Sequence, residues 1–513
     1  MSRKQRKRRE QRAKRKERKA GAREPRPQVE LAPAPYAGRK VPLERLDATR
    51  YRVPRTGTMR THGVVYADER ILPDLEEDRC LEQVANVATL PGIVGPSLAM
   101  PDIHWGYGFP IGGVAAFDPD EGVVSPGGVG YDINCGVRLL SADLSAPELG
   151  GRLDALVDAL FKAVPAGVGS ARRELGLEPA GLQALMRDGL GWAVSEGLAN
   201  EADAQRVEEG GCLPGAEPLR VSERALARGL NQVGTLGSGN HFAEVGVVDE
   251  VYDEQAAAAF GLRAGQVTLM IHSGSRGLGH QVCTDFLADM LRASERYGIP
   301  LVDRQLCCAP VESEPGRRYL QAMAAAANYA FVNRQVMTHW ARQVFDELFG
   351  SPLHTVYDVC HNIAKLETHR FEGRERELLV HRKGATRALP AGHPLVPAAY
   401  REVGQPVIIP GDMGRYSFVL RGAQQSERSF GSACHGAGRL LSRAAAKRRY
   451  GGSNVAERLR KERGVIVRGA SRATVVEEVP EAYKDAAEVV GIVHDGGLAE
   501  RVARIRPLGC VKG

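Results

Sequence analysis

One histidine and two arginines recur at helical spacing in residues 432–443, SACHGAGRLLSR. His435 is followed four and eight residues later by Arg439 and Arg443, and side chains at this spacing share one face of a helix. An imidazole can act as a nucleophile, and guanidinium groups bind phosphate oxygens. Glycines in the segment would let backbone N–H groups approach a phosphate closely. The segment therefore predicts a helix start that combines a reactive nitrogen with an anion site. The alternative is a glycine-rich helix start with an ordinary surface histidine.

A carboxylate and a thiol lie three residues apart in a second glycine-rich segment, GGVGYDINCGVRLL, as Asp132 and Cys135. Both groups bind metals when ionised, and at this spacing they can share one cation or address two. The alternative is that Cys135 is only a small buried apolar side chain.

Three more histidines, His241, His272 and His361, lie at the ends of apolar segments that predict strands. Each alone is typical of an ordinary hydrogen-bonded histidine. Together with the carboxylate and the thiol, they supply enough ligands for two adjacent metal ions that share one ligand. Cysteine with three histidines suggests zinc, whereas a carboxylate and a nucleotide phosphate favour manganese, and composition leaves both open.

Apolar strands that end in functional loops, interleaved with helices, predict a mixed α/β (α+β) fold with the site at the strand ends. Helical periodicity predicts helices over residues 81–93, 281–297 and 319–349. Residues 111–117 predict a strand. The density of glycine and proline in residues 97–113 predicts an irregular loop laid close against other backbone.

The composition is that of an ordinary folded protein, with 43% hydrophobic and 26% charged residues among 513. No apolar run reaches membrane-spanning length, and the charged N-terminus lacks the apolar core of a signal peptide. We therefore expect a cytoplasmic protein that does not bind a membrane. Nine cysteines without a framework spacing predict free thiols in a reducing compartment.

The net charge of +7 is unevenly distributed along the chain. Residues 1–28 contain fourteen Lys or Arg and three Glu, a net charge of +11, which leaves −4 for the rest. Such a tail is expected to be disordered and to bind polyanions in a salt-dependent way, or else to be a solubilising extension. We expect a basic tail and Pro-rich linker over residues 1–40 and the folded body over residues 41–513.

Several runs of this sequence resemble the RtcB family of GTP-dependent RNA ligases: GVGYDINCGVRLL, LGSGNHFAE, HSGSRGLGHQ, HNIAK, HRKGATRA, SACHGAGR and the terminal PLGCVKG. The runs follow the family's order and span residues 41–513. The resemblance implies one large catalytic domain with central β-sheets, surrounding helices and a cleft that holds a dinuclear metal site. It implies GTP and two Mn²⁺ per chain as cofactors, with Cys135 bridging, Asp132 and His241 completing one ion, and His272 and His361 the other.

The resemblance also implies that His435 attacks the α-phosphate of GTP, which releases pyrophosphate and leaves a guanylyl-histidine. GMP then passes to an RNA 3′-phosphate, which the family generates from a 2′,3′-cyclic phosphate. A 5′-hydroxyl end displaces GMP to form the phosphodiester. Dividing one phosphoryl transfer into two steps, with metals neutralising charge, fits covalent catalysis. The expected function is RNA ligation in tRNA splicing or RNA repair, and an archease-type activator is the protein partner that the family suggests.

By the same resemblance, the guanylate pocket consists of Asn240, His241, Phe242, Ala243, Glu244, His361, Asn362, Pro410, Gly411, Asp412, Met413, Ser417, His435, Gly436, Ala437, Gly438, Tyr483 and Lys512. Glu244 is expected to recognise guanine, because a carboxylate can accept hydrogen bonds from both N1–H and the 2-amino group. Candidates for binding the triphosphate or RNA phosphates are Arg228, Arg276, Arg439 and Arg443.

The nucleotide loop departs from the family pattern, since this chain has PGDMGRYS where the family usually has PGSMGTAS. Asp412 replaces a small hydroxyl, and Arg415 and Tyr416 replace small residues. Two alternatives to RNA ligation follow. One is an enzyme that caps 3′-phosphates of RNA or DNA with guanylate and seals weakly. The other is a non-catalytic, basic-tailed nucleic-acid-binding protein whose metal site is structural.

Overall fold

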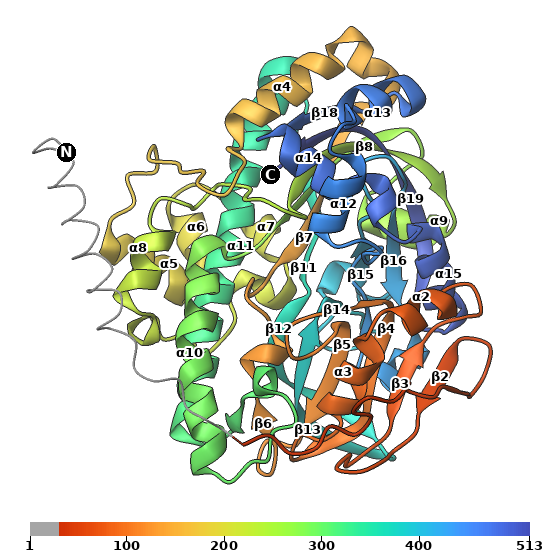
Figure 1. Ribbon diagram of the computed structural model, residues 1–513. Coiled ribbons are helices and arrows are strands. Elements are labelled where there is room, and N and C mark those ends of the chain that lie inside the picture. The colour runs from red at the N-terminus through yellow and green to blue at the C-terminus, as the bar shows by residue number, and fades with distance from the viewer. Residues whose placement is uncertain (1–29) are drawn as a thin grey trace, which may run out of the picture.

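The computed structural model describes residues 30–513, in which helices surround two large β-sheets (Figure 1). The predicted mixed α/β class is thereby confirmed. The basic tail predicted over residues 1–28 lies outside the described residues. Residues 30–40, the described part of the predicted linker, pack along the body: the Ala32 amide donates to the Leu301 carbonyl, and Tyr36 is buried. The domain boundary near residue 41 stays a prediction.

The first sheet has seven strands in the order β1-β2-β3-β4-β5-β13-β12. Its strands are β1 (Glu44–Arg45), β2 (Arg50–Val53), β3 (Gly63–Tyr66), β4 (Ile93–His104), β5 (Ile111–Phe117), β12 (Asn362–Phe371) and β13 (Arg374–Lys383). All neighbours are antiparallel except β3 and β4, which run parallel.

The second sheet has eight strands, seven of them in the order β11-β7-β9-β8-β19-β16-β15, with β18 pairing parallel to β19. Its strands are β7 (Gly136–Ser145), β8 (Phe242–Val251), β9 (Gln266–Ser273), β11 (Leu353–Cys360), β15 (Pro406–Ile409), β16 (Ser417–Gly422), β18 (Ile466–Gly469) and β19 (Ala499–Lys512). Two short pairs complete the strands: β6 (Val123–Val124) with β10 (Ala309–Pro310), and β14 (Ala385–Arg387) with β17 (Ser432–Cys434).

The helices lie around these sheets (Figure 1). They are α2 (Leu72–Glu77), α3 (Cys80–Val87), α4 (Leu153–Ala163), α5 (Pro179–Asp188), α6 (Leu190–Ser195), α7 (Glu201–Ala204), α8 (Glu223–Gly229), α9 (Glu254–Phe260), α10 (Arg276–Arg296), α11 (Glu314–Phe349), α12 (Arg443–Tyr450), α13 (Val455–Arg463), α14 (Arg472–Glu477) and α15 (Ala486–Asp495). Within residues 30–513, no helix combines the length and apolar character needed to cross a membrane.

The long helix α11 both fills the core and holds the loops of the site. Ser313 caps its first turn by accepting from an amide, and Gly350 ends it in the left-handed conformation. Buried Arg334 in the middle of α11 forms an ion pair of 2.7 Å with buried Asp358 of β11. The same guanidinium donates to backbone carbonyls in the segments that carry Cys135 and His272. The helix therefore fixes loops that come from distant parts of the chain.

The three predicted helices correspond to α3, α10 and α11, and the strand over residues 111–117 is β5. The irregular loop predicted over residues 97–113 is wrong, because most of it belongs to β4 and β5. The pairing of these two strands shifts register twice, between Val94 and Leu98 and between Ala99 and His104. The prolines and glycines of this stretch therefore accompany irregularities within a sheet.

Candidate functional site

The five predicted metal ligands meet at the ends of neighbouring strands of the second sheet, although they come from four segments of the chain. Asp132 and Cys135 lie just before β7, His241 just before β8, His272 within β9, and His361 just after β11. β9 pairs with both β7 and β8, and β11 pairs with β7, so these strand ends are neighbours in space. The prediction that the histidines lie at strand ends is confirmed.

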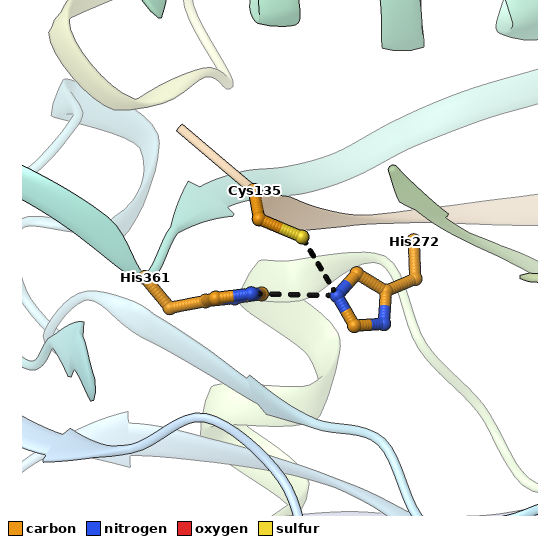
Figure 2. Close-up of side chains that lie close together, drawn as sticks. All are labelled: Cys135, His272 and His361. Atoms are coloured by element: carbon orange, nitrogen blue, oxygen red, sulfur yellow. Dashed lines mark hydrogen bonds between the residues drawn. The ribbon is translucent and has the colours of Figure 1, made fainter. Parts of the chain in front are cut away.

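The ligand atoms converge closely. His272 Nε2 lies 3.2 Å from Cys135 Sγ and 3.3 Å from His361 Nε2, and dashed lines mark both contacts in Figure 2. His241 Nε2 lies 3.4 Å from the same sulfur and 2.8 Å from Asp132 Oδ2. The five residues thus form two triads that share Cys135, one with Asp132 and His241 and the other with His272 and His361. This is the arrangement that two adjacent cations with one common ligand require.

The protonation state of these groups fits cation binding. Burial lowers the pKa of His272 and His361 well below that of an ordinary histidine, so both rings are neutral. His241 places Nδ1 2.9 Å from the Leu236 carbonyl, so a neutral His241 carries its proton there and directs the Nε2 lone pair inward. Sulfur, imidazole nitrogen and carboxylate oxygen atoms therefore converge on one small space, as cation binding requires. Burial raises the pKa of the Cys135 thiol, so a cation would also be needed to stabilise the thiolate.

A glycine makes room for the Asp132 carboxylate. A Cβ atom at Gly274, in the turn after β9, would lie 2.4 Å from Asp132 Oδ1. Any larger residue at position 274 would therefore displace the carboxylate. The Gly/Ser-containing turn after His272 is thus part of the site even though it supplies no ligand.

His435 lies beside this metal centre and has a partner that sequence reasoning missed. Its Nδ1 lies 2.6 Å from Oδ2 of Asp102, a fully buried residue of β4. The same oxygen accepts from the His435 amide at 3.1 Å. Because a carboxylate can only accept, the neutral form of this ring carries its proton on Nδ1 and its lone pair on Nε2. The His435 side chain is 14% exposed, and its ring centroid lies 4.6 Å from that of His361.

The helix predicted to begin around His435 is wrong. Residues 432–434 form strand β17, residues 435–442 are irregular, and α12 begins only at Arg443. Gly438 has φ +75°, and a Cβ atom there would lie 2.4 Å from the Asp102 carbonyl oxygen. The chain therefore crosses β4 in direct backbone contact, which a regular helix with side chains would prevent.

A cavity of about 700 Å³ joins these groups to most of the predicted guanylate pocket. Predicted residues that line it are Asp132, Cys135, Asn240, Phe242, Glu244, His272, His361, Asn362, Pro410, Gly411, Asp412, Met413, His435, Gly436, Ala437, Gly438, Arg439, Arg443, Tyr483 and Lys512. His241 does not line the cavity, but it belongs to the metal-binding triad with Asp132 and Cys135. Ala243 points into the apolar core, whereas its neighbours Phe242 and Glu244 face the cavity, as strand alternation predicts.

Two of the four arginines named as phosphate candidates lie elsewhere, while the other two are held by an unforeseen acid. Arg276 donates to Thr235 and Ser170, and Arg228 donates to Gln281, without lining the cavity. Arg439 and Arg443 both line it and both form ion pairs with buried Glu478, at 3.0 and 2.9 Å. No spacing in the sequence connects Glu478 to these arginines, so only the fold could identify it.

Glu478 is ionised and fixes this side of the cavity. Burial alone would raise its pKa, but Lys512, Arg439 and Arg443 outweigh burial and lower the pKa to about 2. Its carboxylate also accepts a hydrogen bond from the Tyr483 hydroxyl. The arginines, the lysine and the tyrosine are therefore held in place by one anion.

Glu244, the expected guanine-recognising residue, has an unusual environment. Burial and, next, the nearby Asp412 carboxylate raise its pKa to about 8. Ser417 Oγ lies 3.4 Å from Glu244 Oε1 and accepts from the Gly411 amide at 3.0 Å. Ser417 thus contacts two residues of the pocket, Glu244 and Gly411, without lining the cavity itself. Asp412, the residue expected to depart from the family pattern, therefore acts directly on the expected base-recognition group.

Asp412 also organises the altered loop. Its Oδ1 accepts from the amides of Gly414 and Arg415, at 2.9 and 3.0 Å, and its other oxygen pairs with the Arg415 guanidinium. Arg415 in turn donates to the carbonyls of Pro480, Tyr483 and Lys484, at 2.9, 3.0 and 3.1 Å. The two unusual residues together join the nucleotide loop to the segment that carries Tyr483.

Known proteins share this sequence over most of its length. A family model described as tRNA-splicing ligase RtcB matches residues 83–513. The tRNA-splicing ligase RtcB of Thermococcus kodakarensis is 54% identical over 483 residues, which cover 92% of this chain and 99% of that protein. The RNA-splicing ligase RtcB of Mycobacterium tuberculosis is 55% identical over 433 residues, covering 84% of this chain and 100% of that protein. The resemblance of the motifs is therefore confirmed, and the chain belongs to the RtcB family.

Proposed function

We propose that this protein is a GTP-dependent RNA ligase that joins RNA 3′-phosphate or 2′,3′-cyclic-phosphate ends to 5′-hydroxyl ends, in tRNA splicing or RNA repair. The observation that carries the proposal is the placement of His435. Its Nδ1 is bound to Asp102, and its ring lies against His361 of the metal-binding triads. One nitrogen is oriented, and the other has no hydrogen-bond partner within residues 30–513 and lies beside a site suited to phosphates. A histidine in this position is equipped to act as a nucleophile.

In the first step, the lone pair on His435 Nε2 attacks the α-phosphorus of GTP. An N–P bond forms, the bond between the α-phosphorus and the bridging oxygen breaks, and pyrophosphate leaves. The imidazole becomes positively charged as it is guanylylated, and the Asp102 carboxylate at Nδ1 stabilises that charge. Asp102 thus both selects the reactive tautomer and supports the intermediate.

The two triads that share Cys135 would hold two divalent cations, for which we propose Mn²⁺. When bound, such cations would neutralise negative charge on the phosphates. They would thereby lower the electrostatic free energy of bringing the RNA 3′-phosphate close to the guanylyl phosphate. Arg439, Arg443 and Lys512 supply further positive charge along the cavity wall. Glu244 is the residue proposed to accept hydrogen bonds from guanine, which adenine cannot donate.

In the later steps, an oxygen of the RNA 3′-phosphate attacks the phosphorus of the guanylyl group and releases His435. The product carries a 3′-end activated with GMP. The 5′-hydroxyl of a second RNA end then attacks the 3′-phosphate phosphorus, and GMP leaves as the phosphodiester forms. In the first of these transfers an N–P bond breaks as a phosphoanhydride bond forms. In the second, that anhydride bond breaks as the new phosphoester bond forms and the hydroxyl proton is released.

Intact-mass measurement after incubation with GTP and Mn²⁺ tests the catalytic step. Wild-type protein should gain the mass of one GMP, and His435→Ala should not. His494→Ala is a matched control, because this histidine lies near the end of α15 and does not line the cavity. The proposal would be refuted if His435→Ala formed the adduct in the same yield as wild type, or if wild type formed no adduct.

A second function is favoured by one observation, the Asp412 carboxylate beside Glu244. If this altered loop retains the GMP-activated 3′-end but slows sealing, the enzyme would act as a 3′-phosphate capping enzyme on RNA or DNA. Product analysis with a 2′,3′-cyclic-phosphate strand and a 5′-hydroxyl strand separates the two functions. Joined product supports ligation, whereas accumulation of GMP-capped strand supports capping.

A further inference from the structure

Part of the catalytic cavity is lined by aromatic rings to which the proposed reaction gives no role. Trp105, Tyr107 and Tyr131 all line it, and Trp105 remains 44% exposed. The Tyr107 and Tyr131 rings pack edge to face with centroids 5.2 Å apart. Tyr131 also stacks on His280, with centroids 4.9 Å apart and an interplanar angle of 29°. We call these four residues the aromatic shelf.

The shelf adjoins the reacting groups through the chain itself. Trp105 follows directly after β4 and lies three residues beyond Asp102, the partner of His435. Tyr131 directly precedes the metal-ligand candidate Asp132. Trp105 and Tyr131 are therefore near neighbours of the reacting groups along the chain, and both line the cavity that contains His435.

Hydrogen bonds from a buried lysine fix the loop that carries Trp105 and Tyr107. Buried Lys383 donates to the carbonyls of Tyr107, Phe109 and Gly127, the last two at 3.1 Å. These bonds join the loop before β5 to the glycine-rich loop that leads to Tyr131. A lysine whose ammonium is occupied by three backbone carbonyls serves to fix the loops.

A buried glutamine and an aspartate add to this support. The Gln83 side chain donates to the carbonyl of Gly106 at 2.8 Å and accepts from its amide at 2.9 Å. The Trp105 amide donates to Asp78 Oδ2 at 3.0 Å. Rings held in fixed positions lose little conformational entropy when a ligand stacks on them.

The chemistry of the shelf suits nucleobases. Proteins that bind single-stranded RNA place bases on aromatic side chains, and such stacking tolerates any sequence because every base has a π-face. The guanidinium of Arg79, which also pairs with Glu82 at 2.6 Å, lies 5.4 Å from the centre of the Trp105 ring and helps to hold this ring in place. The rings of Trp105, Tyr107 and Tyr131 line the same cavity as His435, which a strand end must enter.

We propose that the aromatic shelf stacks the nucleobases next to the RNA end that enters the catalytic cavity, independently of base identity. This proposal rests on the proposed ligase function, since it assigns a subsite to the RNA substrate. The shelf then determines how an RNA end of any sequence is presented to the guanylylated histidine, while the base-specific contacts are reserved for GTP.

Equilibrium binding of a short single-stranded RNA with a 5′-hydroxyl and a 3′-phosphate tests the shelf, with the full-length protein and no GTP. Trp105→Ala should weaken binding on the order of tenfold or more, and Trp105→Phe should restore most of it. The matched control is Tyr297→Ala, which removes a ring that is 41% exposed and does not line the cavity. Wild-type affinity in Trp105→Ala would overturn the proposal.

A second experiment changes the RNA instead of the protein, so its result does not depend on whether a variant folds. Wild-type protein should bind RNA that is abasic at its first or its last nucleotide on the order of tenfold more weakly than intact RNA. Trp105→Ala should show no further loss on that abasic strand. An equal loss on intact and abasic RNA would refute stacking and indicate that Trp105 contributes to RNA binding without contacting that base. Failure of the ligase proposal is distinguishable, since it appears as a missing GMP adduct in a measurement without RNA.

Discussion

The carboxylate of Asp102 lies 2.6 Å from Nδ1 of His435, although 333 positions separate the two residues in the chain. Strand β4 carries the aspartate and the segment after β17 carries the histidine. The backbones of the two segments also touch, since Gly438 lies against the Asp102 carbonyl. The proposed nucleophile is therefore positioned by both its side chain and its backbone.

Asp102→Asn should slow formation of the GMP adduct on the order of a thousandfold, by analogy with other histidines oriented by a buried carboxylate. The neutral amide cannot stabilise the charged imidazole and no longer enforces a proton on Nδ1. Single-turnover guanylylation measures the effect. Asp253→Asn, which removes a helix-capping carboxylate that does not line the cavity, is the matched control. A rate for Asp102→Asn close to that of the control would contradict the assigned role.

Cys135→Ala should weaken Mn²⁺ binding by at least about a hundredfold, because the sulfur is common to both triads. The protein should still fold, which circular dichroism can check. Metal content after dialysis measures the loss without reference to activity. Cys212→Ala, which removes a thiol outside the cluster, should retain the metal content of wild type. Wild-type metal content in Cys135→Ala would show that the triads are not the metal site.

Guanine nucleotide affinity should rise as the pH increases from about 6 to about 8. Glu244 has a pKa of about 8 and is mostly protonated below it, whereas guanine requires the carboxylate as acceptor. Asp412→Asn removes the neighbouring negative charge, so the midpoint of the rise should move to lower pH. Calorimetric titration with GMP across this range measures both effects.

Glu244→Gln is the control for this pH dependence. The amide cannot ionise, so the rise in affinity with pH should disappear, and discrimination between GMP and AMP should fall.

The same residue affects stability with a definite sign. Because burial raises the pKa of Glu244 in the folded state, the folded protein binds more protons than the unfolded chain, and this contribution to stability falls as the pH rises from about 4.5 through 8. A midpoint unchanged by Asp412→Asn would refute the coupling of the two carboxylates.

Arg415→Ala should destabilise the nucleotide loop and lower the free energy of unfolding by about 2–3 kcal/mol, because it leaves the buried Asp412 carboxylate and three carbonyls with fewer donors. It should also raise the KM for GTP through the displaced Tyr483 segment. Arg401→Ala is a matched control, since this arginine also donates to carbonyls but lies outside the cavity. Denaturant unfolding and GTP titration give the two quantities. A KM equal to that of the control would confine Arg415 to a structural role.

The sequence alone determined which residue types could bind metal and where along the chain they lie. Asp132, Cys135 and the three histidines each border an apolar segment, and strands built from such segments bring their ends to a common edge. The local pattern is informative here because ligand type and strand periodicity are both properties of a few neighbouring residues. The same holds for α10 and α11, whose helical periodicity extends over many turns.

Only the tertiary structure decided the partners of these residues. Asp102 and Glu478 act through contacts with side chains remote in sequence, and no local pattern distinguishes them from other buried acids. The helix predicted at His435 failed because the crossing with β4 overrides local helical spacing. Likewise, the effect of Asp412 on Glu244 requires two loops to meet in a buried pocket, where a second carboxylate raises the free energy of ionising the first. Long-range electrostatics and backbone contact, which a sequence pattern does not encode, thus completed the site.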